Sequence, residues 1–182
     1  MSSDKILSVC AIIISVIALF VSIWQGVVTR EHNKLSVKPN FLVAPILEGK
    51  GGKNGIYLSN AGLGPGIISD AKLVINDEEF DFKKNSWPDV LKKINIKSIC
   101  FSTSWLPAGS ALKSSEEVPL ISITRGDLGA CYIEVMKLIV NNDLKIKINY
   151  SSMYGEQDVI LSNVSMEKDD FNFSKMLGIT SK

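Results

Sequence analysis

Histidine and cysteine are scarce in this chain, and their scarcity limits the chemistry that it can perform. The sequence contains one histidine, His32, and three cysteines, Cys10, Cys100 and Cys131. Zinc sites and nucleophilic triads that depend on histidine need more of this side chain than one copy. The H-E-x-x-H, C-x-x-C, G-x-S-x-G and Rossmann glycine patterns are also absent. We therefore expect no metal site, no cofactor and no enzymatic activity.

A surplus of charge of either sign is missing as well. Lysine and arginine total 20 and aspartate and glutamate total 19, which gives a formal net charge of +1 at pH 7. Proteins that bind duplex nucleic acid through its phosphates carry a basic surplus. We therefore expect no duplex nucleic-acid partner.

The three cysteines lack the spacing of a secreted disulfide framework. Cys10 lies in a long apolar run, which leaves Cys100 and Cys131 in the remainder of the chain. The simplest interpretation is a reducing compartment in which these two residues are free, buried thiols.

Charge and proline are also absent from residues 6–29, between Lys5 and Arg30. About twenty apolar residues suffice to cross the hydrocarbon core of a bilayer as a helix, and only a helix satisfies its own backbone in lipid. The run is too long for a typical signal-peptide core, and no clear A-x-A cleavage site follows it. We therefore predict an uncleaved transmembrane helix.

Small and polar residues recur along this run at alternating steps of three and four. This is the seam spacing of a left-handed helix pair, and small residues allow helices to approach closely in lipid. We expect the helix to pack against copies of itself or against a partner helix. The alternatives are chance clustering on a lone anchor and a narrow pore lined by Ser8, Ser15 and Ser22. The predicted packing face comprises Ser8, Ala11, Ser15, Ala18, Ser22 and Gln25, with Thr29 continuing the spacing.

Basic residues are distributed unequally around the apolar run. Lys5 precedes it beside Asp4, whereas Arg30, Lys34 and Lys38 follow it. The positive-inside rule then places the C-terminal part in the cytoplasm and the short N-terminus outside. We expect a single-pass protein of the bacterial inner (cytoplasmic) membrane.

The rest of the chain is predominantly β in pattern. Residues 144–150 alternate between apolar and polar side chains, as in a half-buried strand. Other short apolar runs, including residues 99–105, are separated by turns rich in glycine and proline, which favours a sandwich. Helical spacing occurs over residues 128–140, and Ser86 can cap a shorter helix near Val90.

The segment 48–55 superficially resembles a phosphate-binding loop. A P-loop requires a lysine followed by serine or threonine at the start of a helix. Here Asn54 follows Lys53, and the apolar residues 56–58 predict a strand. Because Asn-Gly between strands is a hairpin signal, we favour a hairpin over a phosphate cradle.

One group of basic residues is a candidate contact for an anionic ligand or for anionic lipid. The alternative is a solvated helix face. The group comprises Lys83, Lys84, Lys92, Lys93 and Lys97. The tripeptide at 125–127 spells an integrin-recognition sequence, to which we give little weight in a bacterial, cytoplasmic domain.

Three short motifs carry a resemblance to a known pattern. After the apolar anchor come NKLSVKP at 33–39, NAGLGPG at 60–66 and the segment 150–155. In this order they resemble uncharacterised bacterial single-span membrane-anchored proteins with an immunoglobulin-like β-sandwich, in which alanine is expected at Gly66. The resemblance implies a fold and a membrane setting but no activity. It implies a structural turn made by Asn60, Gly62, Gly64 and Pro65.

Together these features predict a mainly β protein: one N-terminal transmembrane helix, then an immunoglobulin-like β-sandwich with two inserted helices. We divide the chain into a tail (1–5), the transmembrane helix (6–29), a juxtamembrane linker (30–38), the sandwich domain (39–170) and a second tail (171–182). The expected function is that of a self-associating membrane-anchored interaction or sensor protein, whose cytoplasmic domain binds an unknown protein partner or small ligand. The alternative is a membrane-disrupting effector of bacterial antiviral defence, activated by a ligand such as a cyclic oligonucleotide. An extracytoplasmic binding or adhesion module is the third hypothesis.

Overall fold

The computed structural model describes residues 3–49, 52–82, 84–123 and 128–166. The chain divides into two units, Met1–Val37 and Lys38–Lys182. Lys83, the tripeptide at 125–127 and the predicted tail at 171–182 lie outside the described residues.

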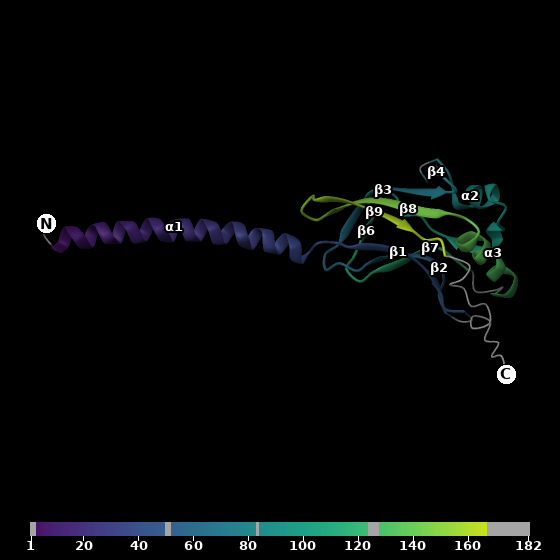
Figure 1. Ribbon diagram of the computed structural model, residues 1–182, viewed down its shortest axis with the longest axis horizontal. Coiled ribbons are helices and arrows are strands. Elements are labelled where there is room, and N and C mark those ends of the chain that lie inside the picture. Colours follow the sequence, from purple (N-terminus) through teal and green to yellow (C-terminus); the bar gives the residue numbers. More distant parts are fainter. Residues whose placement is uncertain (1–2, 50–51, 83, 124–127, 167–182) are drawn as a thin grey trace, which may run out of the picture. The chain divides into compact units, whose positions relative to one another are not determined.

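The first unit consists of a single helix, α1, which spans Ser3–Ser36 (Figure 1). By length and composition it is long and apolar enough to cross a membrane. It extends beyond the predicted span at 6–29 and includes most of the predicted linker, because no residue breaks the helix before Pro39. Asp4 in the first turn and Lys34 in the last complement the helix dipole.

The second unit contains two antiparallel sheets. One has the strand order β1-β2-β7-β5. Pro45 lies in β1, at the edge of this sheet, where a strand tolerates a missing N–H donor. The strands are β1 (Phe41–Leu47), β2 (Asn54–Asn60), β7 (Glu117–Ile123) and β5 (Phe101–Thr103).

The other sheet has the order β4-β3-β8-β9, and the short strand β6 also pairs with β3. Strand β8 alternates between buried and more exposed residues, as the sequence pattern predicted. The strands are β3 (Gly66–Ile75), β4 (Glu78–Asp81), β6 (Ala111–Leu112), β8 (Leu144–Ser152) and β9 (Gln157–Asn163).

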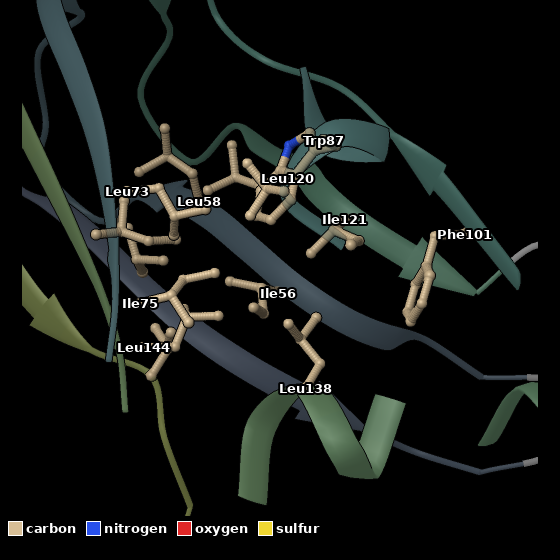
Figure 2. Packing of buried hydrophobic residues seen from close by; sticks show 14 of the residues in the cluster. Ile56, Leu58, Leu73, Ile75, Trp87, Phe101, Leu120, Ile121, Leu138 and Leu144 are labelled. Atoms are coloured by element: carbon tan, nitrogen blue, oxygen red, sulfur yellow. The ribbon is translucent and has the colours of Figure 1, made fainter. Parts of the chain in front are cut away.

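One hydrophobic core lies between the sheets and extends to the helices (Figure 2). Ile56 and Ile121 of the first sheet and Leu73 and Leu144 of the second have no exposed surface. Leu138 of helix α3 (Leu128–Val140) points toward the same cluster (Figure 2). Burial of apolar side chains stabilises a domain by about 25 cal/mol per Å², so this shared core holds the two sheets and the helix together.

Strands β1 and β2 form the predicted hairpin, within which residues 50 and 51 lie outside the described residues. Strands β1 and β2 pair antiparallel, with Leu47 opposite Asn54. Asn54 is buried, its side-chain amide donates to the Gly49 carbonyl at 2.8 Å, and its oxygen accepts from the Gly49 N–H at 2.9 Å. The Asn54 side chain therefore links the start of β2 to the residues that follow β1.

Both predicted helices are present among the strands. Helix α2 spans Trp87–Lys93 and α3 spans Leu128–Val140. Trp87 is buried, and its indole N–H donates to the Ser104 carbonyl at 3.1 Å. In Figure 1 the two helices lie close together beside one end of the sheets.

The predicted strand at 99–105 is confirmed only over Phe101–Thr103. A 3₁₀ turn, η1, spans Ser98–Cys100 and leaves only the short strand β5. The reason is a contact distant in sequence: Cys100 turns toward α3 and bonds to Cys131. Alternation of side chains along 99–105 gives no sign of this contact.

Candidate functional site

An open cleft of about 490 Å³ lies between α2, the following loop and α3. It receives three lysines, two carboxylates and two further polar side chains from these elements. Because α2 and α3 both pack on the core through buried residues, the backbone positions from which their outward side chains extend are fixed. The lining residues are Pro88, Asp89, Lys92, Asn95, Ile96, Lys97, Ser98, Glu134 and Lys137.

Glu134 of α3 organises the inner wall of the cleft. It is only 4% exposed. Its carboxylate accepts hydrogen bonds from the Lys97 backbone N–H at 3.1 Å and from Lys137 Nζ at 2.9 Å. Burial disfavours the charged carboxylate, but these hydrogen bonds outweigh that effect and hold the pKa of Glu134 below its ordinary value. Glu134 is therefore ionised near neutral pH and ties the loop to α3.

Asp89, the second carboxylate, is engaged at the start of α2. It accepts from both the backbone N–H and the hydroxyl of Ser86, at 3.1 and 2.5 Å. Hydrogen bonding from the Ser86 side chain is the main cause that lowers the pKa of Asp89. Ser86 and Asp89 thus form the capping arrangement that begins the helix.

The four described lysines of the predicted basic group do not form one surface. Lys83 lies outside the described residues, and Lys84 is exposed. Lys93 forms an ion pair with Glu78 on β4. Only Lys92 and Lys97 line the cleft.

Sequence reasoning missed the third lysine of the cleft. Lys137 lies on α3, forty residues after Lys97, and no local pattern connects the two. A prediction of the α2–α3 packing would have been needed to place them together. Sequence reasoning also missed Glu134, because its position in the sequence is that of an ordinary residue on a helix surface.

A disulfide between Cys100 and Cys131 fastens the loop to α3, with the Cα atoms 5.1 Å apart. The expectation of free thiols at these positions was therefore wrong. The two cysteines are distant in sequence and become neighbours only when α3 packs beside η1. Glu134 lies one helical turn after Cys131, so the disulfide and the Glu134–Lys97 hydrogen bond hold the same loop to the same helix.

The predicted packing face of α1 is exposed in the single chain. The hydroxyls of Ser8, Ser15 and Ser22 donate to the carbonyls of Asp4, Ala11 and Ala18, at 2.8 to 2.9 Å. Because each hydroxyl proton is engaged within its own helix, contact between two such helices would depend mainly on close packing of small side chains.

The turn at 60–66 is built around Asn60, which is 1% exposed. Its amide donates to the carbonyls of Gly64 and Leu112, and its oxygen accepts from the N–H groups of Asn40 and Gly62. A Cβ atom on Gly62 would lie 2.4 Å from the Asn40 nitrogen. Asn60 and Gly62 therefore join β1, β2 and β6 at this end of the domain.

A second depression of about 470 Å³ is lined by residues of β3, β8 and β9. Its charged lining residues are two carboxylates, Asp70 and Asp158, and Asp158 pairs with Lys38 at 3.1 Å. The cleft between α2 and α3 is therefore the stronger candidate for a charged ligand. Among the described residues, no group of three histidine, cysteine, aspartate or glutamate side chains could hold a metal ion.

Comparisons of the chain with protein families, with curated proteins and with solved structures gave no match.

Proposed function

We propose that the protein is a single-pass, membrane-anchored interaction or sensor module, self-associating through α1, with a β-sandwich that binds a partner or small ligand. The observation that carries this proposal is the combination of an apolar helix able to cross a membrane with a separate two-sheet unit bearing an open basic cleft. A catalytic role has less support, because the cleft holds no nucleophile paired with a base.

The strand order supports an immunoglobulin-like assignment of the domain. Immunoglobulin sandwiches pair strands A-B-E-D in one sheet and C-F-G in the other, with C′ added in variable-type domains. Labelled in chain order, β1-β2-β7-β5 corresponds to A-B-E-D, and β4-β3-β8-β9 corresponds to C′-C-F-G. On this assignment, α2 and η1 are inserted between C′ and D, and α3 between E and F.

Self-association can be measured as energy transfer between donor- and acceptor-labelled full-length chains in liposomes. Ser15→Leu should weaken association about threefold to tenfold, because the larger side chain separates helices that pack through small residues. Val16→Leu changes a neighbouring side chain off the predicted face and should leave the transfer unchanged. Equal transfer in wild type and Ser15→Leu would show that this face is not the contact.

Basic residues favour a cytoplasmic domain, since Arg30, Lys34 and Lys38 follow the apolar run. The effector alternative belongs to this orientation. There, a cyclic oligonucleotide would assemble the domains and the helices would disturb the bilayer. It predicts dye leakage on activation, which replacement of Ser8, Ser15 and Ser22 by leucine should abolish. A module that only binds its partner causes no leakage.

One observation favours a second candidate, an extracytoplasmic binding module. Disulfides persist in oxidising compartments and are rare in the cytosol, where they are usually transient or redox-sensing. The Cys100–Cys131 bond is therefore the feature that argues for the outer side of the membrane.

A further inference from the structure

The cleft between α2 and α3 carries positive charge that the described part of the protein does not neutralise. Neither Lys92 nor Lys97 forms an ion pair with any residue the structure describes, although both line the cleft. Two other lysines of the helices do form ion pairs: Lys93 with Glu78, and Lys137 with Glu134. Two ammonium groups from different elements thus line the same cleft, where three lysines outnumber two carboxylates.

The carboxylates at the cleft are hydrogen-bonded within the structure and form no ion pair with those two lysines, which act on them only as nearby charges. Asp89 is held by Ser86, and Glu134 is held by Lys137 and the Lys97 backbone. A buried, ionised Glu134 fixes the backbone of Lys97 against α3. Glu134 therefore positions the backbone of the loop, and with it the Cα atom from which the Lys97 side chain extends at the cleft.

From this arrangement we propose that the cleft binds a small phosphate-bearing anion, with Lys92 and Lys97 as its direct ion-pair partners. This rests on the proposed function, because it names the ligand class for the binding module. Lysine ammonium groups bind phosphate as point charges and need no planar fork geometry. The side chains of Asn95 and Ser98 supply uncharged polar groups on the same rim.

The size of the cleft agrees with a ligand larger than one phosphate. Its volume of about 490 Å³ falls within the range of small-molecule sites, about 300–1,000 Å³. The phosphate can come from two sources, a soluble nucleotide-like molecule or a phospholipid headgroup. Both present the same charged oxygens to Lys92 and Lys97.

The test uses the full-length chain in dodecyl maltoside, which contains no phosphate, with pyrophosphate as the calorimetric probe. We expect saturable binding that weakens with added salt. Lys92→Gln and Lys97→Gln should each weaken it about tenfold, which corresponds to loss of one charge-assisted contact. Both side chains are exposed, so each variant should keep the wild-type thermal melting curve.

Lys93→Gln is the matched control, because this neighbour of Lys92 pairs with Glu78 outside the cleft. Its affinity for pyrophosphate should equal that of the wild type. Absence of wild-type binding, or an equal loss in Lys93→Gln, would overturn the proposal. The energy-transfer assay on α1 does not depend on the cleft. Failure of the phosphate-binding proposal can therefore be distinguished from failure of the proposed self-association.

A second arm separates the two sources of phosphate. The chain is placed in nanodiscs of phosphatidylcholine with or without phosphatidylglycerol, and the pyrophosphate titration is repeated. A headgroup ligand predicts weaker pyrophosphate binding when phosphatidylglycerol is present, through competition that Lys97→Gln removes. Equal pyrophosphate affinity in both nanodiscs assigns the site to a soluble phosphate ligand.

Discussion

The first residue of β3, Gly66, lies directly against the ring of Phe41 in β1. A Cβ atom added to Gly66 would lie 2.6 Å from Phe41 Cζ and 3.0 Å from Pro39 Cβ. The Phe41 ring is itself stacked on Tyr150, with the ring centroids 4.3 Å apart. The ring therefore has little freedom to move away, which gives a physical reason for glycine where the resemblance implied alanine.

We predict that Gly66→Ala lowers the free energy of unfolding by about 1–3 kcal/mol, as overpacking in a core does. Chemical denaturation of the full-length chain, followed by tryptophan fluorescence, measures the change. Phe41→Leu removes the ring, so the alanine should cost less in the double variant than alone. Strictly additive effects of the two substitutions would contradict the predicted clash.

Glu134 gives a prediction about pH. Its pKa is lower in the folded protein than in the unfolded chain, where it lies near the ordinary value of about 4.3. The unfolded state therefore binds the proton first as the pH falls. The stabilisation from ionised Glu134 is present above the unfolded pKa and is lost as the pH falls through the folded one.

Glu134→Gln should accordingly flatten the acid limb of the stability curve below about pH 4.3. Urea unfolding of the wild type and the variant between about pH 3 and about pH 7, a range that extends below and above the ordinary carboxylate pKa values, measures this difference. The two curves should converge toward low pH. Parallel curves over the whole range would mean that Glu134 does not titrate differently in the folded state.

At the scale of elements, the connection between η1 and α3 is covalent. The disulfide closes a loop with a sequence separation of 31. Cross-linking a loop of this length reduces the entropy of the unfolded chain and stabilises the folded state by about 3–4 kcal/mol in the chain-entropy account. Cys100 is the last residue of η1, so the cross-link lies directly after the segment that carries Lys97 at the cleft.

Cys131→Ser should therefore lower the free energy of unfolding by about 3 kcal/mol when the wild type is oxidised. Treatment with a dithiol reductant under unfolding conditions should remove most of this difference, because both proteins then lack the cross-link. Cys10→Ser is the control, since Cys10 is an exposed free cysteine of α1. A difference that persists in reductant would assign the effect to packing of the side chain.

Local periodicity was sufficient to predict α3 and β8. Apolar side chains at helical spacing give Leu128–Val140, and strict alternation gives the buried face of Leu144–Ser152. Both patterns are repeated within a single element, where neighbouring residues share one geometry.

The cleft could not be predicted in the same way. Lys97, Glu134 and Cys131 come together only because the connection before β5 packs beside α3, a contact between segments distant in sequence. The run at 99–105 alternates like a strand, yet the bond from Cys100 forms at the end of a 3₁₀ turn. Tertiary contact therefore overrode local preference at the place where the candidate site is built.

At the scale of the whole molecule, two features bear on which side of a membrane the domain would occupy in the proposed membrane-anchored protein. The basic residues after the apolar run favour the cytoplasm, and the disulfide favours an oxidising compartment. The two features are independent indicators, because the basic residues act on insertion of the helix and the disulfide depends on the redox environment. A single experiment can therefore measure both in the same cells.

We predict that a reporter active only in the cytoplasm, fused after Lys182, is active, because Arg30, Lys34 and Lys38 follow the apolar run. The same cells, in a Cys10→Ser background, are then denatured in the presence of a maleimide that alkylates free thiols. Its reaction reports whether Cys100 and Cys131 carry free thiols. Reactive thiols would then identify a reduced pair in a cytoplasmic sensor or effector. Protected thiols with an active cytoplasmic reporter would identify a redox-sensing bond. Protected thiols with an inactive reporter would contradict the charge argument and establish the extracytoplasmic module, because the domain would then fold where disulfides persist.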